Sequence, residues 1–488
     1  MYELLGRLAP PIRETILSPS FDHVVSIADV LAQVETMIDQ AQSQHDLDLV
    51  LPVGHQIGRA RPRQDPTAAL PNEILILIGH LVLGVGHPGQ ETASSSWDRF
   101  EKTVDLHRFA LTAVCRRWRA VFSLGEFWTD LRLGSKLLWQ DRDRKRTTVE
   151  NKRIGSRAGK KIDVFCRNGG LQTLDTTRLK SREELLPALG AMMGRSSKIK
   201  AWDLTLPGAI GFPKLWDVWI DEDEFSLERL SVGMSAKQEL LWSMPTGLNV
   251  SSLVDLALDG VMINPATISA NLPHLQSLNL SECVFLDPGG TLDSPKSIRF
   301  PRLRIFHINC QDDEMPWYRE GALRFDLPNL EDLNYGDGGP GFFLPALLPP
   351  RPHVSAIKLT RLVIEYVETE DVLLDILYRH PSIVDLQLPE LADRAQPFYR
   401  VVFSAIGAGC CPALRSLLVW HYREPNRLGT RAAIAMVQAR EEAAARGHKV
   451  TPIREVHLEG DSEEFSKEEN GWMRAHLVMY GQGYLPEE

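Results

Sequence analysis

Two stretches, SLVDLAL at residues 252–258 and HLQSLNL at residues 274–280, can be laid over one another position by position. In each, the second, fifth and seventh residues are apolar; in the later stretch these are Leu275, Leu278 and Leu280. Such alternation is typical of a strand with one buried face, because successive side chains point to opposite faces. We therefore expect a short strand within each stretch.

The same pattern recurs after residue 198. Up to residue 329 the lines start 22 to 28 residues apart, and residues 360–364 supply one further unit where the interval widens. A single unit cannot bury its apolar row, whereas stacked units share one continuous core. The sequence therefore predicts a stack of parallel strands. The other lines are KIKAWDL (198–204), SLERLSV (226–232), RLRIFHI (302–308), NLEDLNY (329–335), SIVDLQL (382–388), ALRSLLV (413–419) and PIREVHL (452–458).

Residues that commonly end helices stand between these lines. Proline stands shortly before several of them, where it would end a backing helix and turn the chain into the strand. Residues 431–446 favour a helix that Gly447 would end, and residues 465–488 could cap the last unit. The prolines are Pro273, Pro301, Pro328, Pro381 and Pro412.

This pattern, with its uneven period, resembles a divergent leucine-rich-repeat solenoid. The resemblance covers residues 134–488 and implies an α/β fold class, with parallel strands on the concave face and helices or turns on the convex face.

The region before the repeats contains two apolar patterns with helical spacing. LPNEILILIGHLVL (70–83) has apolar residues three and four positions apart, and so has DLHRFALTAVCRRWRAVF (105–122). Glycines and Pro88 separate the two. We expect two short amphipathic helices that pack face to face. A third helical pattern, at residues 27–38, is expected to pack on the body of the protein rather than to self-associate, within an N-terminal helix and linker at residues 1–66.

At these helices the chain resembles the F-box family, in particular its fungal F-box-like members. The resemblance rests on LP and EIL (70–75), VCRRW (114–118) and FW (127–128) leading into the strand at 131–133. It covers residues 67–133, with an insert at 85–104 that a compact F-box lacks. Family docking residues correspond here to Leu70, Pro71, Ile74, Leu75, Val114, Cys115 and Trp118.

The resemblance implies a function. An F-box is the helical module by which a substrate receptor docks onto the SKP adaptor of a cullin-RING ubiquitin ligase, so SKP and, through it, cullin and RING subunits are the implied partners. The same apolar residues could instead form the core of a small helical domain, and periodicity leaves both readings open. A scaffold that binds protein through its repeats and never joins a ligase is the alternative function.

Target recognition would fall to the solvent-side positions of the repeat strands. Ordinary surface polarity is the alternative interpretation of these positions. The candidate residues are Gln276, Ser277, Asn279, Arg304, Glu331, Asp332 and Asp385.

Composition limits the partners and the compartment. A net charge of −10 and a pI near 5.8 argue against a general affinity for nucleic acid. The basic run at 142–161 could be an import signal or an anion contact, although a solvated face is the commoner outcome. The most apolar run, 74–85, is too short to cross a bilayer, and no secretory signal is visible. We expect no membrane contact and a cytoplasmic or nuclear location.

The sequence contains no catalytic, cofactor-binding or metal-binding pattern in a context that supports such a site. Gly336, Gly338 and Gly341 fit GxGxxG, but the prolines that follow spoil the helix a nucleotide site needs, so a turn between repeats is favoured over an enzyme. The six cysteines form no CxxC pair and are expected to be reduced, with Cys410 and Cys411 buried. Residues 162–165 (IDVF) are expected to form a strand. We expect no catalytic residue, cofactor or metal in this chain.

Overall fold

The computed structural model of the chain describes Asn72, Leu75, Ile76, Leu111, residues 116–122 and most of 128–482. The gaps within the last range are 134–146, 168–170, 180, 194, 196–197, 208–209, 220–225, 235–239, 245–249, 287–295, 310–322, 337–343, 349–356, 366–369, 389–395, 420–427 and 459–465. The helix expected at 27–38 lies outside the described residues.

The chain divides into two compact units, Met1–Trp128 and Thr129–Glu488. The sequence places the boundary after Leu133 instead. The difference arises because strand β1 (Asp130–Arg132) pairs in parallel with β2 (Thr173–Thr176) and so belongs to the sheet of the second unit.

The first unit contains helical backbone in both expected segments. Asn72, Leu75 and Ile76 are helical, and helix α7 covers Arg116–Phe122. The Arg117 guanidinium donates to Asn72 Oδ1 from Nε at 3.2 Å and from Nη2 at 3.0 Å, and so joins the two segments. Trp128 is buried and its Nε1 donates to the Phe122 carbonyl at 2.6 Å.

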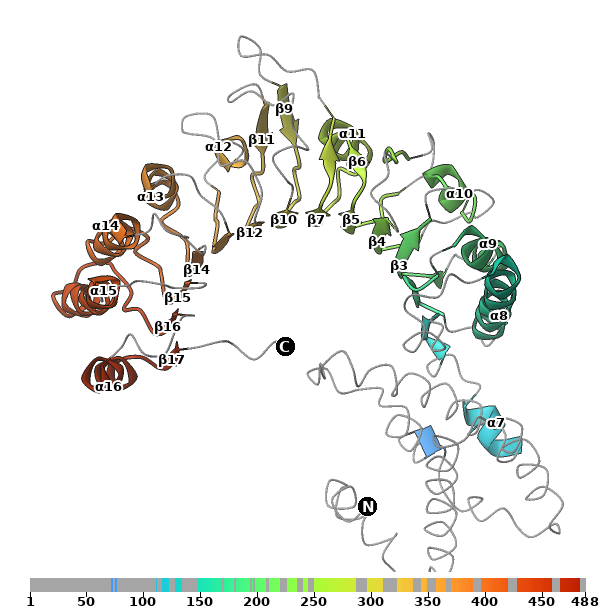
Figure 1. The fold of residues 1–488 in the computed structure, drawn as a ribbon, viewed down its shortest axis with the longest axis horizontal. Helices are drawn as coiled ribbons and strands as arrows, with labels where there is room; N and C mark the ends of the chain where they lie inside the picture. Colours follow the sequence, from blue (N-terminus) through green and yellow to red (C-terminus); the bar gives the residue numbers. More distant parts are fainter. Residues whose placement is uncertain are drawn as a thin grey trace, which may run out of the picture. The chain divides into compact units, whose positions relative to one another are not determined.

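The second unit is an α/β array built on one parallel sheet. Thirteen strands of the described residues follow one another in nearly sequence order, and Figure 1 shows them on the side opposite the helices. The nine predicted repeat lines each contain a strand, and residues 360–364 contain one as well. After β1 and β2 the strands are β3 (Ala201–Leu206), β4 (Arg229–Met234), β5 (Asp255–Asp259), β7 (Ser277–Ser281), β10 (Ile305–Asn309), β12 (Asp332–Tyr335), β13 (Arg361–Ile364), β14 (Asp385–Leu388), β15 (Ser416–Val419), β16 (Glu455–Leu458) and β17 (Met479–Gln482).

Helices and two small sheets back this parallel sheet. Strand β6 (Met262–Ile263) pairs with β8 (Val284–Phe285), and β9 (Lys296–Arg299) pairs with β11 (Leu323–Asp326). None of the described helices combines the length and apolar composition needed to cross a membrane. The helices are α8 (Thr148–Arg167), α9 (Arg182–Met192), α10 (Phe212–Trp216), α11 (Pro265–Asn271), α12 (Leu344–Leu347), α13 (Glu370–Arg379), α14 (Gln396–Gly407), α15 (Leu428–Ala445) and α16 (Lys467–His476).

The core is the stack of apolar rows that the sequence predicts. Leu256, Leu278 and Phe306 lie in register on adjacent strands and are each buried. Because each row continues on the next strand, these apolar side chains are shielded from water by their neighbours. The residues before the strands also interlock: the Val254 carbonyl accepts the N–H groups of Gln276 and Ser277, at 2.8 and 3.0 Å.

The strand expected at residues 162–165 is wrong, because these residues belong to α8. Ile162 and Phe165 are buried on the face that also carries Gly155, Ala158 and Gly159. This face packs on α9 so closely that a Cβ on Gly155 would overlap the Glu183 carbonyl oxygen. Residues 162–165 are therefore one turn of a helix that buries Ile162 and Phe165.

A buried arginine holds the C-terminal part of the array together. Arg440 of α15 is fully buried, and its guanidinium donates to backbone carbonyls of two segments. Burial lowers the pKa of Arg440. Cys410 and Cys411, in the turn before β15, are buried as predicted. The accepting carbonyls are those of Thr451 at 3.1 Å, Cys410 at 3.3 Å, Cys411 at 3.2 Å, Pro412 at 3.1 Å and Leu414 at 3.2 Å.

Gly155→Ala should destabilise the second unit by about 1–3 kcal/mol, because the new methyl group meets backbone that cannot move aside. The measurement is the free energy of unfolding in urea. Gly190→Ala in α9 is the matched control: a Cβ there meets nothing within 4 Å, so helix propensity should give a gain of about 0.5–1 kcal/mol. Equal effects of the two substitutions would contradict the close packing of α8 on α9.

Arg440→Met should lower the free energy of unfolding by about 3 kcal/mol or more, because it leaves buried carbonyls without donors. Arg446→Met serves as the control, since Arg446 is exposed and its guanidinium pairs with Glu442 one turn earlier. Its cost should stay within about 0.5 kcal/mol. Urea denaturation followed by circular dichroism would compare the two variants.

Candidate functional site

The candidate site is the sheet face that points away from the core. The first and third residues of each strand share this face, and we call it the polar face. Strand register aligns its first positions into one row and its third positions into another. The first row, from β4 to β16, is Arg229, Asp255, Ser277, Ile305, Asp332, Arg361, Asp385, Ser416 and Glu455; the third-position row is Ser231, Ala257, Asn279, His307, Asn334, Val363, Gln387, Leu418 and His457.

The seven residues predicted to face a target all lie on this face or at its rim. Gln276, Asn279 and Arg304 are exposed, whereas Ser277, Glu331, Asp332 and Asp385 are half-buried. Backbone bonds join four of the seven, since Arg304 N–H donates to the Gln276 carbonyl and the Arg304 carbonyl accepts the N–H groups of Glu331 and Asp332. Between their side chains, Arg304 Nη2 lies 2.6 Å from Glu331 Oε2. This hydrogen bond lowers the pKa of Glu331. Asp332 and Asp385 lie two strands apart, with Arg361 between them.

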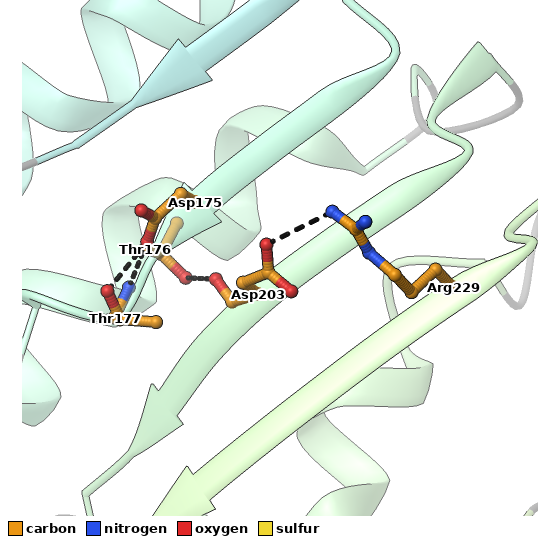
Figure 2. Close-up of polar contacts among 5 residues, drawn as sticks. All are labelled: Asp175, Thr176, Thr177, Asp203 and Arg229. Atoms are coloured by element: carbon orange, nitrogen blue, oxygen red, sulfur yellow. Dashed lines mark hydrogen bonds and ion pairs between the residues drawn. The ribbon is translucent and has the colours of Figure 1, made fainter. Parts of the chain in front are cut away.

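Near the start of the sheet, the hydroxyl group of Thr176 lies in the core and forms hydrogen bonds there (Figure 2). Thr176 of β2 is fully buried; its hydroxyl accepts the Trp202 Nε1–H at 3.1 Å and donates to the Asp203 carbonyl at 3.4 Å. Beside it, Thr177 donates its N–H and its hydroxyl to Asp175 Oδ1, at 2.9 and 2.7 Å. The bonds of Thr176 connect β2 with β3, and those of Thr177 fix the turn that follows β2.

Sequence reasoning missed β2 because Thr176 replaces the apolar residue that ends the other repeat lines. Residues 170–176, GLQTLDT, keep the apolar second and fifth positions at Leu171 and Leu174. Strand register confirms the alignment, since Thr173 pairs with Ala201 of β3. Allowing a hydroxyl at the seventh position would have found the strand.

Charges on the polar face are partly paired. Arg229 Nη2 lies 3.4 Å from Asp203 Oδ2, as Figure 2 shows, and Arg361 Nη1 lies 3.1 Å from Asp332 Oδ2. His307 Nε2 lies 3.9 Å from the other Asp332 oxygen. Burial lowers the pKa of His307 and Asp332 only partly opposes this, so the imidazole is neutral at neutral pH.

Two carboxylates on this side of the sheet are poorly compensated. Burial raises the pKa of Asp385, and the nearby charge of Glu455 raises it further, while Arg361 opposes the rise. Burial, followed by the charge of Glu282, likewise raises the pKa of Asp259. In the first row, β12 to β16 thus carry three carboxylates against the single guanidinium of Arg361. Such a surface attracts a partner that brings positive charge.

Two of the seven residues predicted to bind an adaptor are described. Leu75 is fully buried, and Trp118 is half-buried on α7 with its ring 5.2 Å from that of Phe122. The other five, Leu70, Pro71, Ile74, Val114 and Cys115, lie outside the described residues.

The remaining motifs have structural roles where they are described. Gly336 directly follows β12 and is buried, and a Cβ there would lie 2.8 Å from the Asn309 side chain. Cys283 is buried beside the strands, and its thiol donates to the Leu258 carbonyl at 3.3 Å. No group of three or more His, Cys, Asp or Glu among the described residues is arranged to hold a metal ion.

Comparisons with known proteins add no assignment. No protein-family model matches the chain, and no curated protein matches its sequence. Functional inference therefore rests on the polar face and on the sequence motifs.

Asp385→Asn should raise the free energy of unfolding at neutral pH by less than about 1 kcal/mol. The folded state holds the pKa of Asp385 above its ordinary value, so ionisation costs stability as pH rises through that pKa. The gain should vanish below about pH 3, where the carboxyl is protonated in both states. Urea denaturation across this pH range measures it.

Asp332→Asn is the matched comparison. It removes the charge that pairs with Arg361, so at neutral pH it should instead lose about 0.5–1 kcal/mol. A loss of stability in Asp385→Asn as well would contradict the charge arrangement described for β12 to β16.

Proposed function

We propose that this chain is the substrate-recognition subunit of an SCF-type cullin-RING E3 ubiquitin ligase. An F-box-like domain at residues 67–133 binds the SKP adaptor, and through it the cullin and RING subunits. A leucine-rich-repeat-like solenoid over 134–488 binds the target protein. Ubiquitin transfer belongs to the partner subunits, and this chain positions the substrate.

The observation that carries the proposal is the polar face. It is a continuous sheet surface whose side chains are fixed by strand register, while their own strands bury the opposite rows in the core. Rigid elements present binding groups more accurately than loops do. A broad, rigid and charged surface of this kind suits recognition of another protein.

Support for the adaptor-binding part comes from the order of the F-box-like motifs and from the helical backbone found within them. Arg117, in the VCRRW motif, donates to Asn72, in the LPNEIL motif, so the two motifs lie in contact. An F-box-like helix pair packs face to face, so its two motifs must lie close together although they are far apart in sequence.

The charges of the polar face indicate the chemistry of the target. Asp385 and Glu455 make no ion pair in the described part of the chain, and they lie two strands apart on β14 and β16. A lysine or arginine of the target would relieve their mutual repulsion. The proposed target therefore presents basic residues to this end of the sheet.

The variant Leu70→Asp, Pro71→Ala should lose co-purification with the SKP adaptor, by more than about tenfold relative to the intact chain, because truncated or charged anchors dominate such interfaces. Arg119→Gln, an exposed substitution on α7, is the control and should retain the adaptor. The measurement is quantitative mass spectrometry of proteins captured by the full chain. An intact chain that captures targets without adaptor would instead be a scaffold outside the ligase.

A second pair of variants tests the target-binding face. Asp385→Asn with Glu455→Gln should reduce captured targets while leaving the adaptor bound. Asp371→Asn with Glu370→Gln removes the same charge from helix α13 and serves as the control. Equal target capture by both double variants would exclude β14 and β16 from the binding face.

A further inference from the structure

Helix α8 carries a row of cations that the proposed function does not use. Its 20 residues turn about 100° each, so Arg153, Arg157 and Lys160 share one side. All three are exposed, and the buried residues of α8 lie on the opposite side. With exposed Lys152 they form what we call the α8 basic stripe, which extends over about 12 Å of helix.

The packing of α8 on α9 holds the α8 basic stripe in place. Gly155 and Gly159 bring α8 close to α9, and a Cβ on Gly159 would lie 2.8 Å from the Pro187 carbonyl oxygen. The first turn is fixed as well, because Glu150 accepts the N–H of Thr147 at 2.9 Å and its hydroxyl at 3.1 Å. The cations are therefore presented by a rigid backbone, which lowers the entropic cost of binding.

The cations of the stripe have no carboxylate partner in the described part of the chain. By contrast, Arg167 at the end of the same helix and Arg195 both pair with Asp163. Like charges one turn apart repel one another and weaken a helix by about 0.2–0.5 kcal/mol per pair. This cost is recovered when an anionic partner binds.

We propose that the α8 basic stripe docks an acidic segment of a partner protein. Two observations favour a protein segment over a nucleic acid. The stripe is short, whereas the chain as a whole has a net charge of −10 and repels an extended polyanion beyond it. In addition, Val149 lies one turn before Arg153 and is 76% exposed, which offers an apolar contact that a phosphate backbone cannot use.

The test measures binding of the full chain to a fluorescein-labelled peptide of alternating Glu and Ser, about ten residues long and so able to span the stripe. Fluorescence anisotropy should show binding that weakens as salt rises. The variant Arg153→Gln, Arg157→Gln, Lys160→Gln should weaken it about tenfold, since exposed ion pairs contribute about twofold to fivefold each. Glutamine preserves helix propensity.

Two controls separate the stripe from net charge and from misfolding. Arg431→Gln, Arg446→Gln, Lys449→Gln removes the same charge elsewhere and should change the affinity less than about twofold. Arg153→Lys, Arg157→Lys keeps the charge and should bind within about threefold of the original chain.

Three results would overturn the proposal. One is equal weakening by both triple glutamine variants, which would reduce the effect to net charge. Another is peptide binding that is unchanged in the variant Arg153→Gln, Arg157→Gln, Lys160→Gln, or that is absent in the original chain. The third is tighter binding of a single-stranded DNA or of phosphatidylserine vesicles than of the peptide. The assay contains no SKP adaptor, so its outcome is independent of the ligase proposal.

Discussion

The second unit depends on the way each strand is joined to the next. A carbonyl just before one strand accepts two successive N–H groups at the start of the following strand, as Val254 does from Gln276 and Ser277. The same pair of bonds recurs before β2 to β5, β7, β10 and β12 to β16, so the register of each of these strands is fixed by its predecessor in the sheet. Register in turn decides which side chains enter the core, because a slip of one residue would move each apolar row onto the polar face. The buried rows and the charged rows are thus two results of one backbone arrangement.

This arrangement leaves the two sides of the unit under different constraints. The buried side tolerates a polar group only when it is fully bonded, as Thr176 is through Trp202 and Asp203. The polar face instead retains carboxylates such as Asp385, whose pKa is raised by burial and by the charge of Glu455, so that its ionisation is less favourable in the folded chain than in water. Titratable groups whose pKa is shifted by burial and by like charge cluster at functional sites. The poorly compensated charges are therefore the part of the sheet that stability alone does not explain.

The repeat strands could be predicted because their apolar spacing is local, and every predicted line contains a strand. The β2 strand was missed because Thr176 breaks that spacing, and its compensation by Trp202 is visible only when two strands are side by side. The prediction for residues 162–165 is wrong because four residues cannot distinguish a strand from a helix face; Gly159 and Gly155, one and two turns earlier, decide it through contact with α9. The membership of the polar face was predictable, but the pairing of Asp332 with Arg361 and the isolation of Asp385 depend on cross-strand register. Of the predicted adaptor-binding residues, only Leu75 and Trp118 lie within the described part of the chain.

A stack joined mainly by contacts between neighbours can open progressively from its ends, much as a zipper does. Arg440 changes this at the C-terminal end. Its guanidinium reaches from α15 both to the turn before β15 and to Thr451 before β16, so these elements cannot separate one at a time without stranding buried carbonyls. The elements joined by Arg440, which are β15, α15 and β16, should therefore unfold together. Local unfolding that starts at β17 should not extend into β16 until these bonds break.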